Sequence, residues 1–180
     1  MVQMRVNWQK VFQGVRFSVH RVNLPARSGE SVQRDACVTP EAVVILPIFD
    51  RDTVVMIRNE RFAVGQTLWE LPAGTVEYGE PIVECAGREL IEETGYRAGR
   101  LAHLVDFYPS PGICTENMHA YLAEDLQHVG QHLDDNEQIF VEVMPLSRSM
   151  QMVKDNTIRD GKTMAVLLYY QTFVASGSLD

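Results

Sequence analysis

The stretch GTVEYGEPIVECAGRELIEETGY, from Gly74 to Tyr96, is dense in glutamate, and both of its ends are typical of a helix. Pro81 stands where the first turn of a helix tolerates proline, and Gly95 stands where a C-terminal glycine cap belongs. Between them, apolar residues recur at four-residue steps from Ile82, which predicts one buried stripe. Like charges at helical neighbour spacing destabilise a helix. We therefore expect that a ligand or good solvation offsets the crowded negative charge.

The spacing of the carboxylates suggests what such a ligand could be. Glu89 and Glu93 are four residues apart, so they lie on one face of the predicted helix with Glu92 beside them. Paired carboxylates suit hard cations such as Mg²⁺, which prefer oxygen ligands. On spacing alone, a plain solvated acidic face is favoured over a metal site. An EF-hand is excluded, because its alternating Asp/Asn loop with a central glycine is absent.

The composition of the 180-residue chain narrows the class of protein. Its net charge of −8, from 24 acidic and 16 basic residues, argues against binding to nucleic acid or to an anionic membrane. No apolar run reaches transmembrane length, and the first residues lack the apolar segment of a signal peptide. The three cysteines stand at no metal-ligand spacing and are interpreted as small buried hydrophobes. We expect a cytoplasmic protein that could still bind an anionic substrate through a divalent cation.

Strand patterns lie on both sides of the glutamate-rich segment. Strand character is predicted over residues 9–24, with a second strand over 31–38 pairing back on it, and a hairpin is predicted over 41–62. Further strands are predicted over residues 67–74, 101–110, 116–125 and 137–147, and two helical patterns follow, broken near Arg159–Gly161. This order favours an α+β fold with a mixed sheet over a doubly wound one. His119 is interpreted as a hydrogen-bonded strand residue rather than a catalyst.

The glutamate-rich segment resembles the signature of the Nudix hydrolase family. Gly74, Glu80 and the run Arg88–Tyr96 match G-x5-E-x7-R-E-U-x-E-E-x-G-U at every required position, where U is aliphatic or aromatic. The resemblance implies the Nudix fold, an α/β/α sandwich with a mixed β-sheet. It also implies that metal-activated water cleaves a nucleoside diphosphate linked to another moiety. Mg²⁺ is the expected cofactor, with Mn²⁺ as an alternative and two or more ions per site.

The resemblance assigns roles to individual residues of the motif. The metal ligands of the family correspond to Glu89, Glu93, Glu92 and the backbone carbonyl of Ala73. Arg88 and Glu80 correspond to active-site residues that orient these glutamates through hydrogen bonds. The glutamates are thus expected to form a cradle for the metal ions that carry a diphosphate.

Residues outside the motif indicate a branch of the family. The Pro-Ala-Gly sequence before the motif resembles ADP-ribose and nucleotide-sugar pyrophosphatases, whereas nucleoside-triphosphate members more often carry Pro-Gly-Gly. Pro111 follows Tyr96 by fifteen residues, which is the mark of the ADP-ribose pyrophosphatase branch, although Ser-Pro-Gly is also an ordinary turn. The expected reaction converts ADP-ribose or a related nucleoside diphosphate sugar into a nucleoside monophosphate and a sugar phosphate.

The general base is expected on the loop before the last strand. Glu137 is our prediction, either as the base or as an extra metal ligand. The family pattern has glutamate where Asp135 stands, and aspartate is one methylene shorter. Asp135, Glu137 and Glu142 therefore all stay open as the residue that reaches the water, and the loop could also be a plain exposed turn.

The resemblance further implies a set of substrate contacts. The expected residues are Arg61, Arg34, Phe17, Pro111 and Glu70. Arg61 suits a phosphate because its planar guanidinium binds oxygens bidentately. Arg34 is expected to reach the site of a neighbouring subunit. Phe17 is a candidate for stacking on a nucleobase, with packing in a core as the alternative.

The domain division and assembly also come from the resemblance. Residues 1–40 are expected to form a small β extension, and residues 41–180 the Nudix domain. Because the extension has too little core to be stable alone, we predict a homodimer in which it covers the partner's site. The alternatives are the same chemistry on GDP-mannose, a UDP-sugar, a dinucleoside polyphosphate or a damaged nucleotide. A ligand-sensing module and a metal-dependent isomerase are more distant alternatives.

Overall fold

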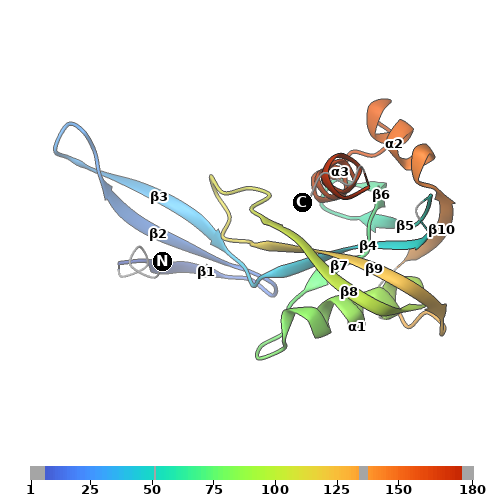
Figure 1. Cartoon of the computed structure of the whole chain (residues 1–180). Coiled ribbons are helices and arrows are strands. Elements are labelled where there is room, and N and C mark those ends of the chain that lie inside the picture. Colours follow the sequence, from blue (N-terminus) through green and yellow to red (C-terminus); the bar gives the residue numbers. More distant parts are fainter. Residues whose placement is uncertain (1–6, 51, 134–137, 176–180) are drawn as a thin grey trace.

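The computed structural model describes residues 7–50, 52–133 and 138–175, and these residues form two sheets. The first sheet, which we call the arm, consists of β1 (Gln9–Gln13), β2 (Ser18–Pro25) and β3 (Ser31–Val38). Its strands are antiparallel in the order β1-β2-β3. The arm projects away from the rest of the molecule, while the turn between β1 and β2 lies back against it (Figure 1).

The second sheet has seven strands, which make up the body of the protein. The path β10-β5-β4-β9-β8 forms the sheet, with β6 paired to β5 and β7 paired to β4. Strand β4 runs parallel to β9 and antiparallel to β5 and β7, so the sheet is mixed. The bounds are β4 (Ala42–Asp50), β5 (Thr53–Arg61), β6 (Gln66–Glu70), β7 (Ala73–Thr75), β8 (Tyr96–Phe107), β9 (Met118–His128) and β10 (Ile139–Pro145).

Helices cover both faces of this sheet (Figure 1). Helix α1 (Ile82–Thr94) lies on one face, and α2 (Leu146–Lys154) and α3 (Gly161–Tyr169) lie on the other, followed by a π-helical turn over Tyr170–Val174. Alternate side chains of β4 enter the two cores, Val43 on the α1 side and Val44 on the other. Because β4 is buried on both faces, it reads as a continuous apolar run rather than an alternating one. The predicted α+β sandwich with a mixed sheet is confirmed.

The ends of α1 agree with the sequence pattern to within one residue. Pro81 occupies the N-cap position rather than the first helical turn, and Gly95 caps the C-terminus with φ of 74°. A Cβ at Gly95 would also lie only 2.8 Å from the backbone nitrogen of Gln131. Both the positive φ and the lack of space for a side chain therefore favour glycine at this position. Ala86 and Leu90 are fully buried, which confirms the predicted apolar stripe.

Several predicted strand bounds were wrong. The pattern over residues 9–24 forms two strands, because a turn closed by a hydrogen bond from Gly14 N to Phe17 O interrupts it. The predicted strand over 67–74 is likewise divided into β6 and β7 at Pro72, which has no N–H to donate. Strand β8 begins at Tyr96, directly after the helix cap and five residues earlier than expected. None of the helices in the described ranges is long and apolar enough to cross a membrane.

Candidate active site

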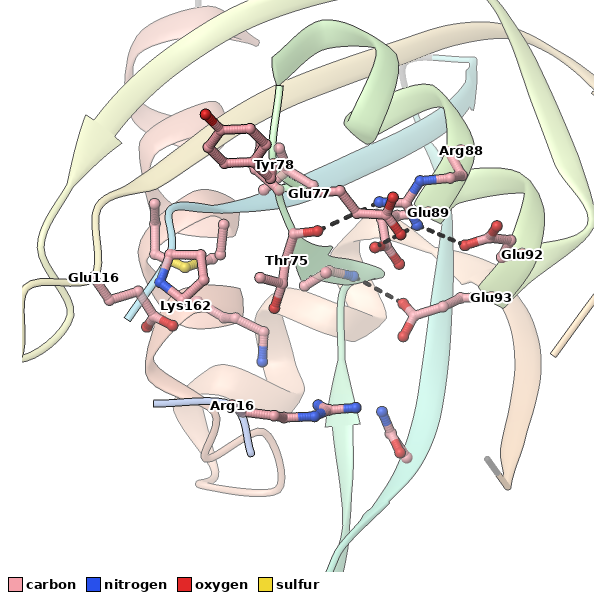
Figure 2. A pocket seen from close by; sticks show the side chains of 18 of the residues that line it. Arg16, Thr75, Glu77, Tyr78, Arg88, Glu89, Glu92, Glu93, Glu116 and Lys162 are labelled. Carbon is pink, nitrogen blue, oxygen red and sulfur yellow. Dashed lines mark hydrogen bonds and ion pairs between the residues drawn. The ribbon is translucent and has the colours of Figure 1, made fainter. Parts of the chain in front are cut away.

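A cavity of about 950 Å³ opens where α1, β7, α3 and the turn between β1 and β2 approach one another. Its lining is dominated by charged side chains. These are Arg16, Arg61, Glu77, Arg88, Glu89, Glu92, Glu93, Glu116 and Lys162. Figure 2 shows the glutamates of α1 on one side of the cavity, with Lys162 and Glu116 across from them and Arg16 below.

Arg88 is the centre of the first wall, which we call the acidic wall. Its guanidinium donates to Glu80 Oε1 from Nε at 2.8 Å, and to both Glu89 Oε1 and Glu92 Oε2 from Nη1 at 2.8 Å. A backbone N–H, that of Glu77, also donates to Glu80. The hydrogen bond from Arg88 lowers the pKa of Glu80 to about 2, and Glu80 in return raises the pKa of Arg88. One guanidinium therefore orients three carboxylates.

Glycine is required beside this cluster for a steric reason. A Cβ built on Gly74 would lie 1.9 to 2.2 Å from the carboxyl atoms of Glu89, so only a residue without a side chain leaves room for that carboxylate. Glu93 is held nearby by the backbone N–H of Ala73, which donates to its Oε2 at 2.8 Å. Glu93 is only 4% exposed. The turn from Ala73 to Gly74 thus meets the carboxylate face of α1 directly.

The acidic wall fits a hard divalent cation. The carboxylates of Glu89, Glu92 and Glu93 line one cavity beside the backbone of Ala73. Oxygen donors of this kind are the ligands that Mg²⁺ and Mn²⁺ prefer. Arg88 already orients two of these carboxylates, as outer hydrogen bonds do around bound metals.

The opposite wall, which we call the basic wall, is built around Glu70. This carboxylate is fully buried and accepts from Arg61 at 2.8 and 2.7 Å and from Lys162 at 2.5 Å. Burial alone would raise the pKa of Glu70, but the hydrogen bond from Arg61 and the charge of Lys162 outweigh it and keep the pKa below its ordinary value. Glu70, expected as a substrate contact, does not line the cavity but holds two cations that do.

Lys162 is a lining residue that the sequence did not reveal. It lies in the first turn of α3, where Asp160 caps the helix by accepting from Thr163 N at 3.0 Å and also pairs with Lys162 at 2.9 Å. The hydroxyl of Thr163 accepts from the backbone N–H of Leu71 at 2.8 Å, which ties α3 to the end of β6. An N-cap aspartate before an apolar helical pattern was the available signal, but only tertiary packing brings that turn to Glu70.

Two further lining residues were also missed. Glu116 precedes β9 and faces the cavity, and burial raises its pKa while Lys162 partly counteracts this. Arg16 comes from the turn between β1 and β2 and reaches the cavity of its own chain (Figure 2). Neither residue belongs to a recognisable motif.

The other expected substrate contacts lie away from the cavity in the single chain. Arg34 is exposed on β3 and donates to the carbonyl of Gln33. Phe17 is 42% exposed, with its ring centroid 6.2 Å from that of Phe12. Pro111 is exposed in a turn. None of these three side chains lines the cavity, so any role in binding needs a second subunit or a closed loop.

Of the candidate bases, only Glu142 lies within the described residues. It projects from β10, is paired with Arg58 at 3.5 Å and does not line the cavity. Asp135 and Glu137 lie outside the described residues.

His119 and the cysteines can also be compared with their predictions. His119 is 8% exposed and hydrogen-bonded to Asp106, which confirms its interpretation as a satisfied strand residue. Cys85 is buried, and burial raises the pKa of its thiol to about 12. Cys37 and Cys114 are only partly buried, so the prediction of buried cysteines was wrong for these two.

Comparison with known proteins places this geometry in a family. The NUDIX domain model matches residues 38–167. The ADP-ribose pyrophosphatase of Bacillus subtilis (strain 168) is 33% identical over 165 residues, spanning 91% of this chain and 89% of that protein. The GDP-mannose pyrophosphatase of Escherichia coli (strain SMS-3-5 / SECEC) is 36% identical over 179 residues, spanning 91% and 92%. A crystal structure of an ADP compounds hydrolase superposes with a TM-score of 0.83 at 25% identity, covering 97% of this chain and 95% of the other.

Proposed function

The chain belongs to the NUDIX family and is a pyrophosphohydrolase of nucleoside diphosphate sugars, and from this premise we propose that ADP-ribose is its preferred substrate. The expected products are AMP and ribose 5-phosphate. The observation that carries the proposal is the pairing of a carboxylate-rich wall with a wall that presents Arg61 and Lys162 across one cavity. Such a cavity suits a diphosphate that binds metal ions on one side and cationic side chains on the other.

We propose that Glu89, Glu92, Glu93 and the carbonyl of Ala73 hold the divalent cations. Mg²⁺ is the expected ion, with Mn²⁺ as the alternative and two or more ions per site. When bound, such ions lower the pKa of water and neutralise charge on phosphate oxygens. Arg88 keeps two of these glutamates oriented between turnovers, because it donates to both.

Glu137 and Glu116 are our candidates for the general base, and Asp135 also stays open on the resemblance. Glu137 remains our first proposal, on the resemblance described above. Glu116 is the second, because it lines the cavity and burial raises its pKa toward the working range of a base. The pH dependence of kcat/KM separates them, since replacing the true base by glutamine removes the acidic limb of the profile, whereas replacing the other residue preserves it.

A substrate panel with one matched pair of variants tests the function. The panel holds ADP-ribose, GDP-mannose, UDP-glucose and diadenosine polyphosphates, with Mg²⁺ or Mn²⁺ present. ADP-ribose should show the highest kcat/KM, and Glu93→Gln should lower turnover on the order of 10³-fold without unfolding the protein. Glu84→Gln is the matched control, because Glu84 lies exposed on the same helix and does not line the cavity. A panel led by GDP-mannose would reject the ADP-ribose preference, and undiminished turnover in Glu93→Gln would reject the site.

We also propose that the protein is a homodimer formed through the arm. The arm exposes several apolar side chains, and a three-stranded sheet needs a covered face to be stable. These are Val11, Phe12, Val15, Phe17 and Leu24. Pairing of two arms would bury them and could bring Arg34 toward the partner's cavity. Sedimentation that shows a monomer at micromolar concentration would contradict this. A cytoplasmic location stays a prediction.

A further inference from the structure

A second group of metal-ligating side chains lies on strands β8 and β9. In the β8–β9 ladder, His103 lies opposite Tyr121 and Asp106 opposite His119, with a shift of register between His103 and Val105. Residues three apart in a regular strand point to opposite faces. The extra residue at this irregularity instead turns His103 and Asp106 toward the same face as His119, as bulges commonly re-aim side chains.

The donor atoms of these three residues converge on one point. His103 Nε2 lies 2.6 Å from Asp106 Oδ1, and His119 Nδ1 lies 2.8 Å from the same oxygen. One ligand atom from each residue falls within 4.8 Å of the other two. The side chains of His103 and Asp106 are each 48% exposed, whereas that of His119 is only 10% exposed. The group is therefore anchored by one buried imidazole and open to solvent on its other side.

The outer ring nitrogen of His119 also has polar neighbours. Its Nε2 lies 3.3 Å from the side-chain amide of Asn117 and 3.8 Å from Glu41 Oε1. Metal-bound histidines almost always direct the other ring nitrogen to such a group, which fixes the tautomer and the orientation of the ring.

We propose that His103, Asp106 and His119 form a binding site for a divalent cation of the Zn²⁺ class, chemically distinct from the glutamate site. Two imidazoles and one carboxylate supply three ligands, which leaves a fourth tetrahedral position for water. Imidazole donors favour Zn²⁺, Co²⁺ or Ni²⁺ over Mg²⁺. Donor atoms about 2.0 Å from such an ion stand roughly 3.3 Å apart, so the exposed pair of His103 and Asp106, now 2.6 Å apart, needs to open by about 0.7 Å.

Binding requires the hydrogens between the donors to move. A carboxylate only accepts hydrogen bonds, so both facing ring nitrogens carry hydrogen in the present arrangement. The cation replaces those hydrogens, and His119 then carries its hydrogen on Nε2, which lies 3.3 Å from the side-chain amide of Asn117 and 3.8 Å from the carboxylate of Glu41. None of the three ligands lines the catalytic cavity. A bound ion would link β8 to β9 where the loop carrying Glu116 begins and ends.

Titration of the full chain with Zn²⁺ in millimolar Mg²⁺ tests the site. Calorimetry should show one Zn²⁺ per chain, and Co²⁺ in its place should give the visible absorption of a tetrahedral N/O site. His103→Gln removes an exposed ligand without disturbing a core, and it should weaken Zn²⁺ binding at least about 10-fold. His128→Gln is the matched control, because His128 lies on β9 against Tyr96 and outside the group. The affinity of this variant for Zn²⁺ should equal that of the wild type.

The Glu89→Gln/Glu93→Gln double variant separates the two metal sites. It should retain the Zn²⁺ stoichiometry and the Co²⁺ spectrum, because the glutamates take no part in this group. Equal affinity in His103→Gln and wild type would overturn the proposal, and so would loss of Zn²⁺ binding in the glutamate variant. Neither readout depends on turnover, so failure here leaves the proposed function standing.

Discussion

The two walls of the cavity differ in how their charges are balanced. In the acidic wall one guanidinium, that of Arg88, serves three carboxylates, so negative charge remains in surplus. In the basic wall the charges of Arg61 and Lys162 are balanced by Glu70 and Asp160. The first wall therefore keeps a surplus of negative charge that an added cation can balance, whereas the charges of the second wall are already paired. In the proposed function, the acidic wall would hold the metal ions and the charge-balanced basic wall would contact the substrate.

Of the substitutions considered, Gly74→Ala should have the largest effect, because it disrupts the acidic wall. The new Cβ would overlap the carboxylate of Glu89 and displace it, so we expect metal affinity to fall and kcat/KM to drop on the order of 10³-fold. Metal titration followed by steady-state kinetics measures both. Gly87→Ala provides the control, because its Cβ would meet only Leu101 at an ordinary 3.6 Å and helical alanine is favoured over glycine by roughly 0.5–1 kcal/mol. Full activity in Gly74→Ala would show that turnover does not depend on the observed position of the Glu89 carboxylate.

Glu70→Gln should break the basic wall with the next largest effect. The substitution leaves two buried or half-buried cations with one charge fewer to balance them, and breaking a buried ion pair costs about 3–5 kcal/mol. We expect loss of unfolding free energy in denaturant titration and a rise in KM. Glu60→Gln, at an exposed position of β5, should change neither. An unchanged free energy of unfolding in Glu70→Gln would mean that the contacts of Glu70 with Arg61 and Lys162 make no net contribution to stability.

Lys162→Met should test the charge of Lys162 separately from the size of its side chain. The methionine keeps the length of the side chain but removes its charge, and a charged hydrogen bond contributes about 1.5–3 kcal/mol. KM should therefore rise about 10-fold or more, with a smaller change in kcat, because Arg61 stays bound to Glu70. Lys154→Met, at the exposed C-terminal end of α2, serves as the control. A fall in kcat alone would instead assign Lys162 to the chemical step.

Glu80→Gln should have the smallest effect on turnover and a defined dependence on pH. The pKa of Glu80 is about 2 in the folded protein and 4.5 ordinarily, so its stabilisation is complete above pH 4.5 and is lost as the pH falls toward 2. The difference in unfolding free energy between wild type and variant should shrink over that window. Urea unfolding at a series of pH values measures it, with Glu84→Gln as control. A difference that is constant with pH would exclude the ion pair as its source.

The two walls also differ in how far the sequence could predict them. The acidic wall comes from one helix and the turn before it, so helical spacing and an intact motif were sufficient to predict Glu89, Glu92 and Glu93 as neighbours. The basic wall joins β5, β6 and α3, and Lys162 is 92 residues from Glu70 along the chain. No local pattern encodes such a contact.

Local irregularities were hidden for a related reason. The turn at Gly14 and the register shift after His103 each change the face of the sheet on which a side chain lies. One extra residue, however, barely changes the alternating pattern of apolar residues in the sequence. The sequence therefore predicted the sandwich, its central helix and the mixed sheet, but not the division of residues 9–24 or the convergence of His103 with His119.

The position of the arm in the chain has a consequence during translation. The arm ends at Val38, whereas β4 gains its parallel neighbour only when β9 is complete at His128, some 90 residues later. At about 5–20 residues per second, a ribosome needs roughly 5–18 s to make that segment. For much of this interval the apolar side chains of the arm have left the ribosome, while the loop that its inner end contacts, through Cys37 and Ile113, is not yet made. The nascent chain is therefore most exposed to aggregation early, and a chaperone that binds apolar strands would act on the arm first.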